Sequence, residues 1–233
     1  MSKYIKSPMA KTQDQQNIDL SETLSKTEQY IEQNRKTLSI ILGAVIGVIA
    51  IYLIYQKMYV GGKEKSAREQ MFFAEAYFRQ DSLNLAINGD GTNPGFAQIA
   101  EDYGVSPSGN LAKLYLGMSY LRSGKYEEAI SALKDYSGSD AITPSLALAG
   151  IGDAYMEQNK TDDAISYYEK ASKKNENNFS TPLILMKLGG AYEAAGKYND
   201  ALETYERIKK DYSATNEGRD VEKYIARAKA KVK

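Results

Sequence analysis

An internal repeat constrains the fold of this chain more than any other feature of its sequence. Each copy has a glycine, a tyrosine three residues after it, and an alanine nine residues after the tyrosine. The three copies are Gly117/Tyr120/Ala129, Gly152/Tyr155/Ala164 and Gly189/Tyr192/Ala201. The glycines are 35 and then 37 residues apart. A period of this length predicts a row of similar supersecondary units that stack and bury a continuous core.

The pattern resembles the tetratricopeptide repeat (TPR), a pair of helices of about 34 residues. A large side chain follows each alanine by four positions, at Leu133, Tyr168 and Tyr205. Thr143-Pro144 and Thr181-Pro182 each offer an N-cap followed by proline at the first helical position. We therefore expect the glycines and alanines to let helices approach closely, and the tyrosines to fill the space between hairpins.

Residues Thr37 to Tyr55 form an uncharged stretch of 19 residues. At about 1.5 Å per residue, a helix of this length spans roughly 28 Å, close to the hydrocarbon thickness of a membrane. A cleaved signal peptide has a shorter apolar core, and a buried soluble helix is rarely apolar on every face. We therefore expect a retained transmembrane helix. Basic residues flank it almost equally on the two sides, so the charges do not orient it.

Gly43 and Gly47 form a G-x-x-x-G pair inside this stretch. The motif is typical of close contact between membrane helices, so it predicts a helix–helix contact in the membrane. The apolar spacing from Asp19 to Lys36 predicts a short amphipathic helix that leads into the span.

The expected fold class is all-α, with a single N-terminal transmembrane helix followed by a TPR α-solenoid. The solenoid comprises three clear repeats, a degenerate leading hairpin (residues 63–80 and 96–103) and a C-terminal capping helix. The expected segments are 1–36 (polar, with the amphipathic helix), 37–55 (transmembrane), 56–109 (linker and leading hairpin), 110–217 (three repeats) and 218–233 (cap). Residues 88–95 lack the glutamate that a calcium loop needs at its twelfth position, so they predict a plain turn.

The amino-acid composition argues against several classes of function. The chain has no histidine and no cysteine, which removes thiol nucleophiles, histidine acid–base catalysis and structural zinc. Its 30 basic and 30 acidic residues balance, so no basic field indicates nucleic acid. We expect a protein that is not an enzyme and takes no cofactor, metal or small-molecule substrate.

In a TPR array the first helix of each hairpin faces a concave groove. Counting from Asn110, Ser145 and Pro182, we expect positions 2, 5, 9, 12 and 13 to form the protein-binding groove. These residues are Leu111, Leu114, Met118, Leu121 and Arg122, then Leu146, Ala149, Asp153, Met156 and Glu157, then Leu183, Met186, Gly190, Glu193 and Ala194.

This set of groove residues is largely apolar and contains three methionines, as is typical of surfaces that accept varied apolar sequences. If the groove works in this way, Met118→Asp with Met156→Asp should abolish capture of unfolded apolar segments without unfolding the array. The alternative is that residues 63–80 fold into the groove and bury it.

Several stretches resemble a known family. The segment from Glu32 to Leu38, the Gly-rich span and Ser66-Ala67-Arg68 are similar to YfgM-like ancillary subunits of the Sec translocon. The stretches Gly124–Ile130 and Gly152–Tyr155 look typical of TPR proteins of this type in Bacteroidetes.

This resemblance implies an inner-membrane protein with a cytoplasmic N-terminus and periplasmic repeats. Its implied partners are Sec translocon subunits, emerging secreted chains and periplasmic chaperones, and its implied role is holdase-like. The alternative function is a scaffold that assembles a cell-envelope complex for division or secretion.

Overall fold

The computed structural model describes residues 28–232 and has two compact units, with the boundary between Tyr55 and Gln56. Every regular element within the described range is a helix, as the repeat pattern predicts. The helices of the second unit are α3 (Gly61–Arg79), α4 (Leu83–Asn88), α5 (Phe96–Tyr103), α6 (Pro107–Arg122), α7 (Tyr126–Asp135), α8 (Thr143–Glu157), α9 (Thr161–Lys173), α10 (Thr181–Ala194), α11 (Tyr198–Asp211), α12 (Asn216–Asp220) and α13 (Glu222–Lys229). A π-helical turn, Tyr55–Val60, precedes α3.

The first unit is built on one long apolar helix, α2 (Arg35–Ile54). Its 20 residues span about 30 Å, and none of them is buried. Its length and composition are sufficient to cross a membrane. Residues 28–33 are also helical, whereas the start of the predicted amphipathic helix, residues 19–27, lies outside the described residues. A Cβ atom added at Gly43 or Gly47 would meet no atom within 4 Å.

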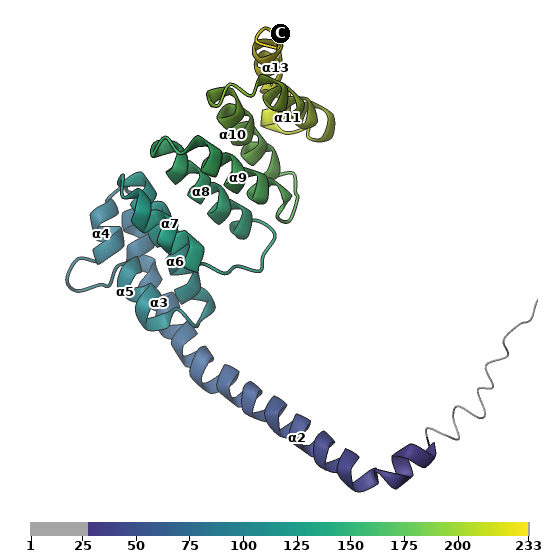
Figure 1. Cartoon of the computed structure of the whole chain (residues 1–233). Helices are drawn as coiled ribbons and strands as arrows, with labels where there is room; N and C mark the ends of the chain where they lie inside the picture. The colour runs from purple at the N-terminus through teal and green to yellow at the C-terminus, as the bar shows by residue number, and fades with distance from the viewer. Residues whose placement is uncertain (1–27, 233) are drawn as a thin grey trace, which may run out of the picture. The chain divides into compact units, whose positions relative to one another are not determined.

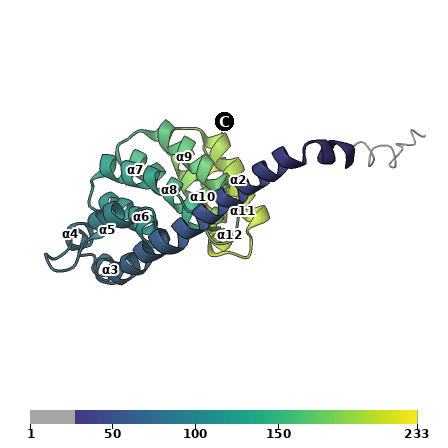
Figure 2. The same cartoon turned by 90° about the horizontal axis from the view of Figure 1, so that it is seen from below.

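The second unit contains three hairpins, α6–α7, α8–α9 and α10–α11, which follow one another along the chain (Figure 1 and Figure 2). Each first helix packs against its own second helix and against the second helix of the preceding hairpin. Ala129, Ala164 and Ala201 are all fully buried at these contacts. Tyr155 and Tyr192 pack against the core clusters between hairpins, as predicted.

The repeat glycines permit the closest approach inside each hairpin. A Cβ atom at Gly117 would lie 2.5 Å from the Leu133 side chain. At Gly152 it would lie 2.6 Å from the Tyr168 ring, and at Gly189 2.3 Å from the ring of Tyr205. Real Cβ atoms do not approach a neighbour this closely, so a larger residue at any of these positions would force the packed side chain to shift. The large residue of each repeat therefore packs directly on the backbone of the first helix.

The turn inside each hairpin contains one residue with a left-handed backbone. These residues are Gly124, Asn159 and Gly196, with φ values of 75°, 59° and 73°. Asn159 replaces glycine in the second repeat, because asparagine tolerates this conformation better than other side chains do.

The leading hairpin follows the same pattern one unit earlier. Ala74 and Tyr77 occupy the glycine and tyrosine positions, and Asp81 adopts the left-handed turn conformation with φ 58°. Ala86, fully buried on α4, corresponds to Ala129. The second helix of this hairpin is interrupted after α4 and continues as α5.

The loop between α4 and α5 is the predicted turn. The Asp90 carboxylate accepts hydrogen bonds from the backbone N–H groups of Thr92 (2.8 Å) and Asn93 (2.7 Å) and from the Tyr77 hydroxyl (2.6 Å). These bonds, with the Asn93 backbone contact foremost, hold the pKa of Asp90 far below its usual range. The carboxylate is thus used to close the loop.

The loops between hairpins correct the predicted caps. Thr143 and Thr181 lie inside the first turns of α8 and α10 and do not act as N-caps. Instead, Asp140 accepts from the N–H groups of Ile142 and Thr143, both at 2.8 Å. At the corresponding place before α10, the Asn177 side-chain oxygen accepts from the N–H of Ser180 at 2.8 Å. An Asx turn before each helix therefore replaces a threonine cap.

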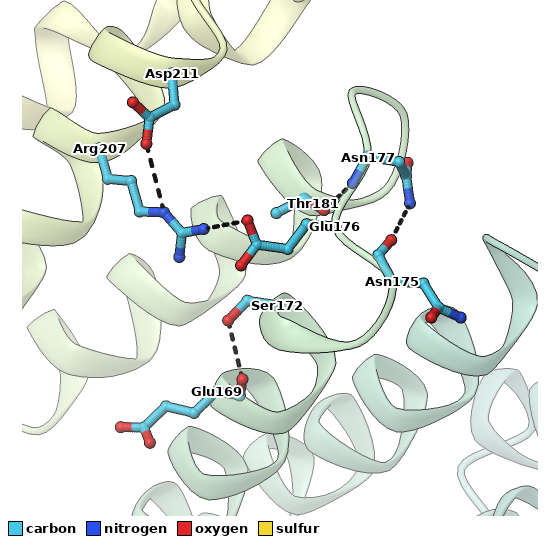
Figure 3. Close-up of polar contacts among 8 residues, drawn as sticks. All are labelled: Glu169, Ser172, Asn175, Glu176, Asn177, Thr181, Arg207 and Asp211. Atoms are coloured by element: carbon cyan, nitrogen blue, oxygen red, sulfur yellow. Dashed lines mark hydrogen bonds and ion pairs between the residues drawn. The ribbon is translucent and has the colours of Figure 1, made fainter. Parts of the chain in front are cut away.

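Figure 3 shows how the loop before α10 is fixed in place. The backbone N–H of Asn177 donates to the Thr181 hydroxyl at 2.9 Å, and the side-chain amide of Asn177 donates to the backbone carbonyl of Asn175 at 2.8 Å. Arg207 of α11 reaches Glu176 at 2.9 Å and Asp211 at 3.7 Å. The start of α10 is therefore tied to both the loop and α11.

The C-terminal cap begins at Asn216, two residues before its predicted start, and consists of α12 and α13. The Thr215 hydroxyl caps α12 by accepting from the N–H of Gly218 at 3.1 Å. Val221 and Ala228 are fully buried against α11, and the Arg227 guanidinium binds both carboxylate oxygens of Glu193. The cap closes the last hairpin with apolar contacts beneath and a charge pair at the edge.

Two neighbouring glycines of α10 give a matched test of this packing. Gly189→Ala should lower the free energy of unfolding by roughly 1–3 kcal/mol, because its methyl group overlaps the Tyr205 ring. Gly190→Ala meets no atom within 4 Å and should raise the free energy of unfolding by up to about 1 kcal/mol through helix propensity. Urea unfolding of the full chain in detergent measures both. Equal effects of the two substitutions would contradict the packing described.

Burial of Tyr205 predicts that the free energy of unfolding falls at alkaline pH. Burial, with the nearby Glu193 carboxylate, raises the pKa of Tyr205 to about 12, against about 10 in the unfolded chain. The folded state thus favours the neutral phenol, so this contribution is complete below about pH 10 and is lost as the pH rises towards 12. Tyr205→Phe should flatten the fall in unfolding free energy between these pH values. An unchanged pH profile in Tyr205→Phe would contradict the assignment.

Candidate protein-binding groove

A groove of about 710 Å³ lies along the first helices of the three hairpins. It is bounded by α6, α8 and α10, with Gly124 from the first hairpin turn, Tyr126 from the start of α7 and Tyr168 from α9. Its other lining residues are Leu121, Arg122, Asp153, Met156, Glu157, Lys187, Gly190 and Ala191. A space of this size accommodates a few residues of an extended chain.

The C-terminal halves of the first helices supply the predicted residues that line this groove. They are Leu121, Arg122, Asp153, Met156, Glu157 and Gly190. Leu146 is half-buried, and Leu183 is 41% exposed at the start of α10. Ala194 is exposed and lies with Glu193 beside the cap helix α13.

Other predicted groove residues are used for packing. Ala149 is 3% exposed and belongs to the core, so its prediction as an open groove residue is wrong. Leu111 packs against the core of the leading hairpin, and Leu114 packs between the first two repeats. Glu193 is held by Arg227 of α13, and its side chain is only 16% exposed. Its carboxylate therefore holds the cap.

The methionines are not a free apolar surface. Met118 packs against the core between the first two repeats, and Met156 and Met186 pack against the core of the second and third repeats. An aspartate at Met118 or Met156 would place a charge against these clusters and destabilise the array. The two substitutions are therefore expected to lower the stability of the array as well as its binding, so they do not separate binding from folding.

The centre of the groove is polar, which the sequence pattern did not reveal. The Lys187 ammonium donates to both oxygens of Asp153, at 2.7 Å and 3.0 Å, and so links α10 to α8. The Tyr168 hydroxyl donates to the same carboxylate at 2.7 Å. Burial, followed by the charge of Asp153, raises the pKa of Tyr168 well above its usual range. The tyrosine is therefore a neutral donor at any physiological pH.

Lys187 and Tyr168 were missing from the predicted groove. The repeats contained one signal for Lys187, because the equivalent positions in the other two repeats are Tyr115 and Gly150. Among the three repeats, a charge occurs at this position only in the third. In the numbering of the repeat, Asp153 of the preceding repeat is three positions later, about one helical turn away. Stacking the two repeats therefore brings the opposite charges together, which indicates an ion pair across the junction.

The rim of the groove carries two more charges. The Arg122 guanidinium pairs with Asp81 and lies 4.8 Å from the centroid of the Phe78 ring, so the leading hairpin holds it. Glu157 is exposed, and its closest recorded partner is the Tyr126 hydroxyl at 3.4 Å.

Residues 63–80 do not fill this groove. α3 packs against α4, α5 and α6, as the first helix of the leading hairpin. Its buried residues Ala67, Met71 and Ala74 form one cluster with Phe96 and Ala112. This helix therefore packs near Leu111 of α6 but does not line the groove between α6, α8 and α10, so the alternative in which it fills the whole groove is wrong.

Comparison with known proteins agrees with this geometry. Residues 96–141 and 150–214 match the tetratricopeptide repeat family. A solved structure of similar fold is that of the nearly identical TPR-like repeats from a Podosopora anserina protein described as a kinesin light chain. It has a TM-score of 0.56 and 17% identity, and the match covers 72% of this chain and 87% of that one.

A second structure of those repeats, carrying one substitution, has a TM-score of 0.56 and 18% identity over the same shares of the two chains. At these identities the likeness shows the fold alone. No curated protein matches the chain in sequence. Residues 96–141 and 150–214 therefore match the tetratricopeptide repeat family and form an all-helical repeat module, a kind of fold that typically binds other proteins.

Proposed function

We propose that this chain is a membrane-anchored TPR protein that binds polypeptides beside the Sec translocon as one of its ancillary subunits. The observation that carries the proposal is the joining of two parts in one chain. One is an apolar helix with no buried face, and the other is a repeat domain with an open groove.

The exposed apolar surface of α2 supports the membrane anchor. Ile40, Val48 and Ile51 are 73%, 67% and 70% exposed, and large apolar side chains cover the helix on all sides. Such a surface is unfavourable in water, since each fully buried aliphatic side chain contributes about 1.5–3 kcal/mol. The hydrocarbon core of a bilayer matches its length and removes this surface from water.

The role at the translocon rests on the resemblance of residues 32–38 and 66–68 to YfgM-like subunits. On this proposal the N-terminus is cytoplasmic and the repeats are periplasmic. The partners are Sec subunits, emerging secreted chains and periplasmic chaperones, and the repeats act as a holdase. The groove supports this role through its chemistry, because Met156 and Leu121 offer apolar contact beside the polar groups of Lys187 and Glu157. An extended polypeptide needs both kinds of contact.

Charges in the apolar helix should release the chain from membranes. Ile46→Lys with Ile49→Lys places two ammonium groups near the middle of α2, each costing about 2.5–3.5 kcal/mol on insertion. The variant should appear in the soluble fraction after carbonate extraction. Phe72→Lys with Phe73→Lys, at exposed positions of α3, is the matched control and should remain in the membrane. Membrane retention of the α2 variant would contradict the anchor.

Photo-crosslinking from the groove distinguishes the translocon role from a scaffold. A photoreactive residue at Glu157 in intact cells should capture Sec subunits and many different secreted chains. The same residue at Glu128, an exposed position on α7, should capture few of them. Protease added to spheroplasts should digest the repeats. One or two stoichiometric partners, without secreted chains, would instead support a scaffold, and repeats protected in spheroplasts would refute a periplasmic domain.

A further inference from the structure

Gly190 is the one glycine in helices α6 to α11 that the packing of these helices does not explain. A Cβ atom at Gly109, Gly117, Gly150, Gly152 or Gly189 would approach a neighbouring atom to 3.0 Å or less. At Gly190 it would meet nothing within 4 Å. Glycine inside a helix costs about 1 kcal/mol relative to alanine. The residue therefore weakens α10 without any packing benefit in the described part of the chain.

Gly190 lines the groove and also a smaller space between α10 and the cap helix α13. Gly190 and Ala191 form the α10 side of the groove, and Met156 and Leu121 line it from α8 and α6. A side chain at position 190 would project into the groove and reduce its volume. The location explains why glycine occurs at position 190, which helix packing does not. A small residue here lets the backbone or a bulky side chain of a partner approach α10 closely.

The charged residues of the groove indicate which charge a partner should carry. Of the charged residues that line the groove, Arg122 is paired with Asp81, and Asp153 is paired with Lys187. Glu157 is the remaining charged group there, and the structure records no ion pair for it in residues 28–232. The open negative charge favours a positive group on the partner.

Lys187 adds a donor for the partner backbone. Its ammonium has three N–H groups, its recorded bonds go to Asp153, and its side chain is 37% exposed. A carbonyl of an extended chain lying in the groove can accept from this ammonium, while Asp153 keeps it in position.

We propose that the groove binds an extended polypeptide segment in which an apolar side chain lies over Gly190 and a neighbouring lysine or arginine pairs with Glu157. This inference rests on the proposed polypeptide-binding function and specifies the segment that the site selects. Gly190 is a specificity-determining residue whose absent side chain defines the pocket.

Fluorescence anisotropy of the full chain in detergent tests the proposal with two flexible synthetic peptides. One contains leucine followed by lysine, and the other contains leucine followed by glutamate at the same place. The wild-type chain should prefer the lysine peptide, and added salt should reduce that preference. Gly190→Leu should weaken binding of the lysine peptide at least about tenfold, whereas Ser166→Leu, on the exposed face of α9, should not change it.

Glu157→Lys should reverse the preference towards the glutamate peptide, and Glu128→Lys, on α7, should leave it unchanged. Gly190→Ala separates binding from folding, because it should weaken peptide binding while the chain becomes more stable. Wild-type affinity in Gly190→Leu, or an unchanged preference in Glu157→Lys, overturns this inference.

The failure of this inference is distinguishable from failure of the proposed function. If Gly190→Leu loses neither the peptide nor the secreted chains that are crosslinked in cells, the groove assignment fails and the translocon role stands. If the wild-type chain crosslinks to no secreted chain in cells, the proposed function fails, whatever the peptides do.

Discussion

The contact between a large side chain and a helical glycine underlies the rest of this structure. In the second and third hairpins a tyrosine ring lies on the backbone of the first helix, against Gly152 and Gly189, and in the first hairpin Leu133 packs on Gly117. This contact sets the distance between the two helices of a hairpin. Because each hairpin then packs on the next, it also fixes where the first helices lie, and these helices carry the groove.

The repeat pattern predicted this framework because the same physical requirement recurs at a fixed spacing. Glycine, alanine and a large residue must occur together wherever two helices approach closely, so the sequence carries a periodic signal. The sequence predicted the leading hairpin only in part, because its spacing departs from the period of the other repeats. Ala74 and Ala86 keep the spacing, but the loop from Gly89 to Gly95 interrupts the second helix and shifts the period to 43 residues, from Ala74 to Gly117.

The groove was harder to predict than the fold. Position counting placed Asp153, Met156 and Glu157 in one groove, and all three line the groove of the structure because the helical phase within each repeat is fixed. It placed Ala149 in the groove although the next hairpin covers it, and it left Glu193 open although the cap helix binds it. Such contacts depend on neighbouring units, so a count within one repeat cannot reveal them. For the same reason, the link from Lys187 through Asp153 to Tyr168 depends on the stacked helices, and the unusual charge of Lys187 is its one trace in the sequence.

Stability and binding make opposite demands on α10. Gly189 serves packing, and the adjacent Gly190 leaves open the space that we propose a partner fills. Hydrogen–deuterium exchange of the full chain in lipid nanodiscs, with and without a bound unfolded polypeptide, tests the central claim most directly. We expect slow exchange throughout α2, and slower exchange in α8 and α10 when the polypeptide is present. Rapid exchange in α2, or protection confined to helices outside the groove, would contradict a membrane-anchored groove that binds polypeptides.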